Sequence, residues 1–215
     1  MKKTVLLLPF GPAAEEAARW FATHGDRVYF AGKNAPGGTF PLPADPLDPV
    51  SLSEAIRKIQ QDAGLLDILV LGIPHTADEP VGAPHDYDAM LQTMTDALYG
   101  CRAWIEACLP LLEKGMKRIA AITKPESSNS WSTGENDLAY SASLAALNMM
   151  GKIHFNRLRP QGYTFRWYCQ SDVTGGMCAA EYISSSLCYD EKQPTIHSDE
   201  NRFTLRDAYL REISW

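Results

Sequence analysis

Two patterns of hydrophobic and polar positions alternate along this 215-residue chain. Short, almost continuous apolar runs are typical of buried parallel strands. They predict strands over residues 4–9, 27–32, 66–72, 117–123 and 163–170, a short one around 40–42, and a last one over 202–207. Longer segments carry apolar residues at the spacing of an amphipathic helix. They predict helices over residues 13–25, 51–64, 87–114, 137–158 and 176–188.

Several residues mark where these helices begin, end or bend. Gly25 is expected to terminate the first helix. Ser51 followed by Glu54 predicts a capping box at the start of the second. Pro110 lies inside the long third helix, where we expect it to kink or end the regular turn. The segment 33–50 is rich in proline and glycine, so we expect no proper helix between the second and third strands.

Strands that alternate with helices indicate a parallel sheet covered on both faces. We therefore predict an α/β fold: a Rossmann-like, doubly wound, mostly parallel sheet of six or seven strands, shortened between the second and third. Residues 1–215 are expected to form a single domain. Ligands of such sheets bind beyond the carboxyl ends of the strands. The informative loops are thus those after Leu8, Ala31, Val70 and Thr123.

Composition narrows the range of partners and compartments. The formal charge is −6 with no basic stripe, which argues against nucleic acid and anionic membranes as partners. No run of about 18 apolar residues is present, so no membrane span is expected. The segment "MKKTVLLLPFGPAA" has features of a signal peptide, but Pro9 and Pro12 interrupt it and favour a first strand. Five cysteines without a CxxC pair predict reduced thiols in a cytoplasmic protein and no metal site.

Segments in a fixed order resemble the short-chain dehydrogenase/reductase family, over nearly the whole chain. Its first strand, helix and second strand are similar to "KKTVLLLPFGPAAEEAARWFATHGDRVYFAGKN", and its fourth strand to "GLLDILVLG". Its long dimer-forming helix resembles "YDAMLQTMTDALYGCRAWIEACLPLL", its Tyr-x-x-x-Lys helix "AYSASLAALNMM", and the next strand "RLRPQGYTFRWYCQSD". For an active member, the resemblance implies hydride transfer with NAD or NADP.

The family's glycine-rich loop lets the backbone approach a pyrophosphate at a helix N-terminus. This chain has "LLPFGPAAEEA" at that place. Gly11 remains and is the candidate cofactor-binding residue, but Pro9 and Pro12 flank it, and proline removes an N–H donor. Glu15 and Glu16 follow in the first turn, where they would repel a phosphate. The alternative is a tight turn that binds nothing.

Two more positions are candidates for a cofactor site by the same resemblance. Lys33 follows the second strand, where the resemblance places the 2′-phosphate site of an NADP-preferring relative, although we favour an ordinary solvated surface lysine. Gly72 ends the fourth strand, where "LVLGIP" replaces the family's asparagine-rich loop. The missing helix after the second strand removes part of the wall around the adenine. We therefore expect no cofactor, and NADP or NAD if there is one.

The family's catalytic set of Asn, Ser, Tyr and Lys maps onto this chain incompletely. Tyr140 matches the tyrosine, but the lysine position holds Leu144, and the asparagine aligns near Met94. The serine position points to Ser127. By strand register, Thr123 or Lys124 fits that place as well, and Lys124 would restore a cation beside the phenol. Without such a cation, a tyrosine keeps a pKa near ~10 and is a poor base.

Other residues near the strand ends are candidates for acid–base work. His75 follows the fourth strand, with Asp78 and His85 nearby in the sequence, and a His–Asp pair serves proton transfer or metal binding. The spacing matches no known metal motif, and an exposed loop histidine is the plainer interpretation. Trp131 is placed to cover a pocket. Asp172 and Thr174 lie where relatives close a loop over the nicotinamide.

The helices over 87–114 and 137–158 are apolar over wide faces, which predicts a homodimer or tetramer through them. Three functions remain open. The first, which we favour, is a family homologue that has lost hydride transfer and acts as a binding or partner subunit. The second is an atypical NAD(P)-dependent oxidoreductase. The third is a cofactor-independent lyase or isomerase that acts on a small molecule bound near Tyr140, with Ser127 or His75.

Overall fold

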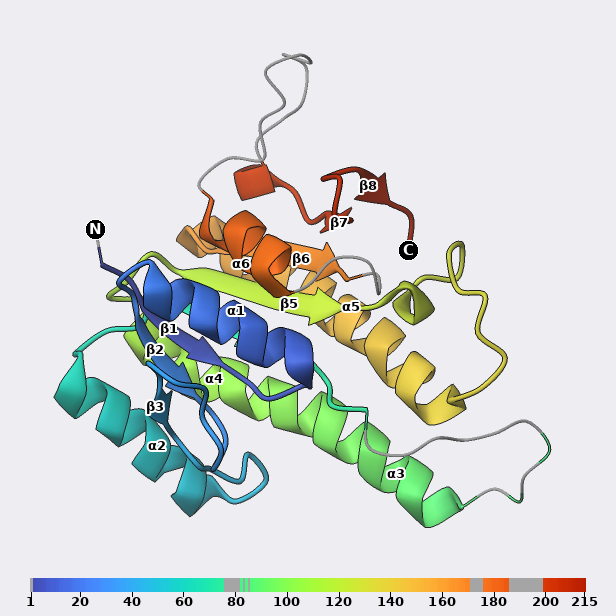
Figure 1. Ribbon diagram of the computed structural model, residues 1–215, viewed down its shortest axis with the longest axis horizontal. Coiled ribbons are helices and arrows are strands. Elements are labelled where there is room, and N and C mark those ends of the chain that lie inside the picture. The colour runs from blue at the N-terminus through green and yellow to red at the C-terminus, as the bar shows by residue number, and fades with distance from the viewer. Residues whose placement is uncertain (1, 76–81, 83, 85, 171–175, 186–198) are drawn as a thin grey trace.

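The eight strands form one sheet in the order β3-β2-β1-β4-β5-β6-β7-β8 (Figure 1). This computed structural model describes residues 2–75, 82, 84, 86–170, 176–185 and 199–215. Neighbouring strands are parallel except for β7 and β8, which are antiparallel. The strands are β1 (Thr4–Leu7), β2 (Arg27–Phe30), β3 (Phe40–Pro41), β4 (Ile68–Leu71), β5 (Arg118–Thr123), β6 (Thr164–Cys169), β7 (Leu205–Arg206) and β8 (Glu212–Ile213).

Helices cover both faces of this sheet, as Figure 1 shows. Helices α1 and α6 share one hydrophobic core with one face, and α2, α4 and α5 share a second core with the other. The helices are α1 (Pro12–Thr23), α2 (Pro49–Asp62), α3 (Tyr87–Thr95), α4 (Cys101–Leu112), α5 (Leu138–Leu158) and α6 (Gly176–Ser184). None of the helices in the described part of the chain is both long and apolar enough to cross a bilayer.

The buried pattern of the central strands explains this layering. Strands β1, β4 and β5 are buried along their whole length, so they need cover on both faces. On one face α1 buries alanines and Phe21, and these small side chains let the helix approach the sheet closely. The predicted Rossmann-like, doubly wound, mostly parallel fold is therefore confirmed, and so is the absence of a helix between β2 and β3.

The number of strands and the start of α2 differ from the prediction. The described residues form eight strands instead of six or seven, because the chain turns back at Asp207 and adds β8 at the edge. The Asp207 carboxylate accepts hydrogen bonds from the backbone N–H groups of Tyr209 and Arg211, which stabilises that turn. The predicted capping box at Ser51 is wrong. Asp48 caps α2 instead, and its carboxylate accepts from the N–H groups of Val50 and Ser51.

The long helix is continuous from Tyr87 to Leu112 and contains an irregular turn that the sequence did not predict. A π-helical turn, η1 (Asp96–Gly100), joins α3 to α4. Pro110 lies inside α4, which ends two residues later. Isolated π-turns are frequent at functional sites, and this one faces the carboxyl ends of the strands, because Asp96 and Gly100 line a cavity there with Leu8 and Gly72.

Candidate functional site

Tyr140 lies in the first turn of α5 and points toward the carboxyl end of β4. Its side chain is buried, and its hydroxyl donates a 3.4 Å hydrogen bond to the Ile73 carbonyl. Burial raises the pKa of the Tyr140 phenol to about 12, and the nearby carboxylates of Glu126 and Asp137 add to the rise. The environment therefore holds the phenol protonated. It is a proton donor and not a base at neutral pH.

His75 and Asp137 surround this phenol. The His75 ring meets the Tyr140 ring edge-on, with 4.7 Å between centroids. His75 Nε2 lies 3.3 Å from the Asp137 carboxylate, and both side chains are partly exposed. Asp137 precedes α5 in a left-handed conformation, with φ of 60° and ψ of 49°. The two sequence candidates His75 and Tyr140 are thus brought together, with a carboxylate that sequence analysis had not singled out.

Lys124 is the residue after β5 that faces Tyr140. Its ammonium lies 5.6 Å from the centroid of the phenol ring, over the face of the ring. A cation there makes a cation–π contact, but the Tyr140 pKa is raised and not lowered. The lysine position of the family offers no substitute, because Leu144 is 1% exposed within the core.

Ser127 is directed elsewhere. A single 3₁₀ turn, η2 (Pro125–Ser127), follows Lys124, and the Ser127 N–H donates to the Lys124 carbonyl. This turn places Ser127 in the wall of a separate cavity, which has no lining residue in common with the cavity at Tyr140. Thr123 is buried at the end of β5. Of the three serine-position candidates, Lys124 lines the Tyr140 cavity.

That cavity is small and strongly polar. Its volume is about 210 Å³, below the range of about 300–1,000 Å³ typical of ligand pockets. It is lined by His75, Lys124, Glu126, Gly134, Glu135, Asn136, Asp137 and Tyr140. Three of these side chains are carboxylates. The geometry supports proton transfer between a His–carboxylate pair and a protonated phenol, on a compact substrate that is not an anion.

A second cavity of about 540 Å³ lies beyond the carboxyl ends of β1, β2 and β4, where doubly wound sheets hold nucleotides. Gly72 lines it, and the Phe10 ring packs directly on this glycine: a β-carbon at position 72 would lie 2.1 Å from the ring. Asp45 and Asp96 also line the cavity. The cavity thus contains two carboxylates, and an aromatic ring packs on the glycine in its wall.

The loop after β1 differs from a phosphate-binding loop in two residues. Gly11 precedes α1 with a φ of 115°, a conformation that favours glycine, and Pro12 is the first helical residue. Proline has no N–H for a phosphate oxygen. Glu15 lies in the first turn, 2.8 Å from Arg19. A pyrophosphate at this helix end would meet a missing donor and a carboxylate, so the residues present fit a dinucleotide poorly.

Lys33 lines an adjoining cavity of about 350 Å³ that shares Ala31, Ala44 and Asp45 with the larger one. Its place corresponds to the predicted one beyond β2, but Asp45 shares the cavity and offsets its charge. Asp78, His85, Asp172 and Thr174 lie outside the described residues. Within the described ranges, no group of three or more His, Cys, Asp or Glu side chains converges as metal ligands.

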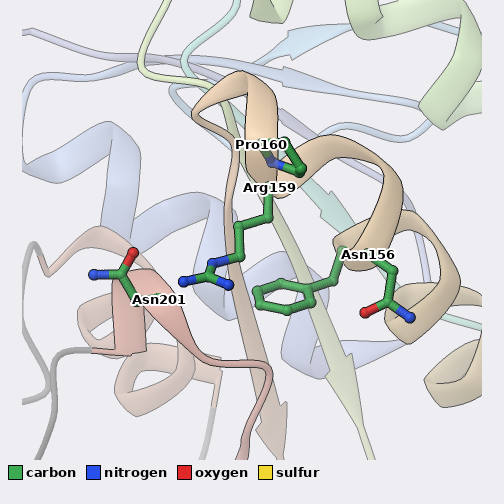
Figure 2. A pocket seen from close by; sticks show the side chains of 5 residues that line it. Asn156, Arg159, Pro160 and Asn201 are labelled. Atoms are coloured by element: carbon green, nitrogen blue, oxygen red, sulfur yellow. The ribbon is translucent and has the colours of Figure 1, made fainter.

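A further cavity, of about 500 Å³, lies at the opposite end of α5 (Figure 2). Phe155, Asn156, Arg159, Pro160 and Asn201 line it, and the Arg159 side chain extends toward Asn201. It is remote from the carboxyl ends of the strands, since α5 starts beside Tyr140 and runs 21 residues to Leu158. This groove therefore plays no part in the chemistry around Tyr140.

No protein-family model and no curated protein sequence matches the chain. Among solved structures, the Sniffer protein of Caenorhabditis elegans superposes with a TM-score of 0.78 at 13% identity, over 100% of both chains. The Pseudomonas aeruginosa RhlG/NADP complex gives 0.68 at 17% identity, over 82% of this chain and 75% of that one.

A third match, ligand-free aldohexose dehydrogenase of Thermoplasma acidophilum, gives a TM-score of 0.62 at 18% identity. The match covers 79% of this chain, and this chain spans 65% of the length of that enzyme. Further matches are short-chain dehydrogenases/reductases. The chain therefore has the short-chain dehydrogenase/reductase fold, and one structural neighbour binds NADP. The resemblance predicted from the ordered segments is confirmed for the fold.

Proposed function

We propose that this chain is a short-chain dehydrogenase/reductase homologue that does not transfer hydride and acts as a binding or partner subunit. The observation that carries the proposal is the contact of the Phe10 ring with Gly72, which packs the loop after β1 against the end of β4. Pro12 at the start of α1 removes a phosphate donor as well. Tyr140, with a pKa of about 12 and Leu144 one turn away, does not serve as the base of alcohol oxidation.

Cofactor binding is testable with an internal probe. Trp104 is buried and lines the 540 Å³ cavity, so bound NADPH would accept excitation energy from it. We expect no saturable energy transfer up to about 1 mM NADPH, near the upper end of ordinary enzyme affinities. Saturable transfer that disappears in Trp104→Phe would contradict the proposal and favour the alternative, an atypical NAD(P)-dependent oxidoreductase.

The partner role draws support from exposed apolar side chains on two adjacent helices. Tyr87 and Leu91 on α3, and Ile153 on α5, are each more than half exposed, and α3 packs beside α5. A monomer would leave these side chains in water. We propose that a second copy of the chain covers them. Light scattering should give a dimer or tetramer, and Leu91→Glu with Ile153→Glu should give a monomer. A monomeric parent would contradict this.

A second candidate function rests on the His75–Asp137 pair beside Tyr140. These groups suit a cofactor-independent proton transfer next to a carbonyl, as in a lyase or isomerase. The discriminating measurement is exchange of α-hydrogens of small ketones and aldehydes in deuterium oxide. The partner-subunit proposal predicts the same rate for the parent as for His75→Ala and Tyr140→Phe. Faster exchange by the parent, lost in both variants, would replace it with the acid–base enzyme.

The free cysteine thiols of the described residues support a proposal about localisation. Among the described cysteines, Cys101, Cys108, Cys169 and Cys178 are free, and the first three are buried. Reduced thiols are the rule in the cytoplasm. We therefore propose a cytoplasmic protein, and a fluorescent fusion in fractionated cells tests it.

A further inference from the structure

A cavity of about 470 Å³ lies on a different side of α5 from Tyr140. Its walls come from α5, from the loop after β5 and from the segment around β7 and β8. The volume falls within the range of about 300–1,000 Å³ typical of small-molecule sites. It has no lining residue in common with the Tyr140 cavity or with the cavity that contains Gly72. A ligand in this cavity would therefore bind apart from both the Tyr140 cavity and the cavity that contains Gly72.

Two buried polar atoms in this wall have no partner. Ser127 and Asn148 are each 4% exposed. The Asn148 Nδ2 donates to the Ser127 carbonyl at 3.2 Å, which fixes the amide. The remaining atoms, Ser127 Oγ and Asn148 Oδ1, have no hydrogen-bond partner among the described residues. Buried polar atoms are normally satisfied, so these two unpaired atoms make Ser127 and Asn148 a polar part of the cavity wall.

The other walls of this cavity are apolar, and ring stacking, a hydrogen bond and close packing fix their positions. Phe203 and Trp215 stack with 5.1 Å between centroids and 4° between planes. The backbone beside Trp215 is fixed by the loop after β5, because Ser128 Oγ donates to the Ser214 carbonyl at 2.6 Å. Gly151 lets Phe203 approach α5, since a β-carbon there would lie 2.9 Å from that ring. The aromatic walls are thus positioned before any ligand arrives.

The charge of this cavity is opposite to that of the Tyr140 cavity. Its lining includes one cation, Lys152, and no Asp or Glu, although the chain as a whole carries a charge of −6. Lys152 Nζ lies 4.9 Å from the Phe155 ring centroid and 6.0 Å from that of Phe203. No described carboxylate pairs with Lys152. A negative group at the cavity mouth would therefore gain a charge-assisted hydrogen bond.

We propose that this cavity binds a small amphipathic anion. The ligand has an aromatic or branched apolar body that contacts Met149, Phe203 and Trp215. It carries an acidic group that binds Lys152. A neutral apolar molecule would leave Lys152 unused. A second copy of the chain, the other occupant to consider, would have to bring a carboxylate into the same cavity.

Two matched fluorescent probes test the proposal on the intact protein. Anilinonaphthalene sulfonate has an apolar body, an N–H and a negative group, and N-phenylnaphthylamine is its neutral counterpart. We expect one saturable site for the sulfonate, about tenfold weaker in Lys152→Gln. The neutral probe should bind equally to the parent and to Lys152→Gln. Ala145→Phe, which fills the cavity, should abolish binding of both.

Two variants outside the cavity serve as controls. Lys58→Gln removes an equivalent exposed cation from α2, and Leu91→Ala removes apolar surface from α3. Neither should change binding of either probe. Sulfonate binding that Lys152→Gln leaves intact, or that Leu91→Ala weakens as much as Lys152→Gln does, would overturn the proposal. If Ala145→Phe fails to fold, the comparison of Lys152→Gln with Lys58→Gln decides.

The oligomeric state tests the remaining alternative, in which a second copy of the chain fills the cavity. Light scattering of Lys152→Gln and Ala145→Phe should match that of the parent. If Ala145→Phe dissociates an oligomer and the parent binds no sulfonate, a second copy fills the cavity and the small-molecule proposal is wrong.

Discussion

The aromatic ring of Phe10 lies so close to Gly72 that no side chain fits between them: a β-carbon at position 72 would be 2.1 Å from the ring. Phe10 comes from the loop after β1, and Gly72 directly follows β4. These two strand ends flank the crevice in which doubly wound sheets hold nucleotides. The contact therefore packs the loop after β1 directly against the end of β4, beside this crevice.

Gly72→Ala should destabilise the fold through this contact. The added methyl group forces the Phe10 ring out of place, which costs about 1–3 kcal/mol of unfolding free energy by overpacking. In a Phe10→Ala background the same substitution should cost much less, because the clash is gone. Urea unfolding of the four proteins measures the coupling. Additive effects would show that Phe10 swings into solvent without loss, and would contradict the packing.

The Tyr140 phenol should ionise near pH 12. Its pKa is raised by burial and by the carboxylates of Glu126 and Asp137. Absorbance titration of the parent, with Tyr140→Phe subtracted, isolates its phenolate. Glu126→Gln and Asp137→Asn should each lower the pKa toward the ordinary value. A pKa below 10 would mean that Lys124 activates the phenol, and would revive a catalytic base at this position.

The same shift gives a pH dependence of stability. The unfolded phenol ionises near pH 10, whereas the folded one holds its proton up to about 12. The pKa of the Tyr140 phenol is higher in the folded state than in the unfolded state. The stabilisation that the protonated phenol contributes is therefore fully present below the unfolded pKa. It is lost as the pH rises through the folded value. Unfolding free energies measured across this alkaline window should fall less steeply with pH in Tyr140→Phe than in the parent.

Leu144→Lys should not create a dehydrogenase. The substitution restores the family's lysine in the sequence, but Leu144 is 1% exposed in the core. Burial of an ammonium there should cost several kcal/mol of stability or expel the side chain from its place. Pro12 and the Phe10–Gly72 contact stay unchanged. Assays with NADPH and a panel of ketones should show no cofactor oxidation above the parent, with Leu144→Met as the folded control. Measurable oxidation would show that the loop at Gly11 binds the cofactor.

The buried ion pair of Asp199 and Arg206 should contribute strongly to the stability of the fold. Arg206 donates to both carboxylate oxygens of Asp199, at 2.7 and 3.0 Å, and the Tyr182 hydroxyl donates to one of them. Burial raises the pKa of the Asp199 carboxyl, but these bonds and the Arg206 charge outweigh it, and the pKa falls below its ordinary value. Asp199→Asn leaves the guanidinium buried without its counter-charge, and should cost about 3–5 kcal/mol.

The pH dependence of the Asp199 variant gives an independent check. Because the folded pKa is lowered, the stabilisation is present above the unfolded pKa and is lost as pH falls through the folded one. Acid unfolding of Asp199→Asn should therefore lack that part of the pH dependence. Asp199→Leu combined with Arg206→Met should be less destabilised than Asp199→Asn alone. Equal stability of parent and Asp199→Asn in urea would contradict the pairing.

Local sequence patterns predict the layers of this fold because strands buried on both faces are apolar without interruption. The runs at residues 4–9 and 66–72 are such cases, and the proline-rich gap at 33–50 excludes a helix for a local reason. The start of α2 at Pro49 was missed because Asp48 competes with Ser51 as a cap, and a cap is decided by one side-chain rotamer. The strand β8 rests on a turn at Asp207 that no hydrophobic pattern announces.

The candidate site was predictable only in part, for a related reason. Tyr140 and His75 were found because each lies at a strand or helix end whose direction the fold dictates. Ser127 was assigned to the same place by counting residues, and the 3₁₀ turn after Lys124 directs it into another cavity. The Phe10–Gly72 contact joins two loops that are far apart in sequence. Side-chain direction in such loops follows from three-dimensional packing and leaves no periodic signal.

Isothermal titration calorimetry with NADPH and NADH decides whether this protein holds a nicotinamide dinucleotide. We expect no saturable heat for either cofactor with the parent protein, under conditions in which circular dichroism shows it folded. Micromolar binding of either cofactor, at one molecule per chain, would contradict the proposed loss of hydride transfer and favour an NAD(P)-dependent oxidoreductase.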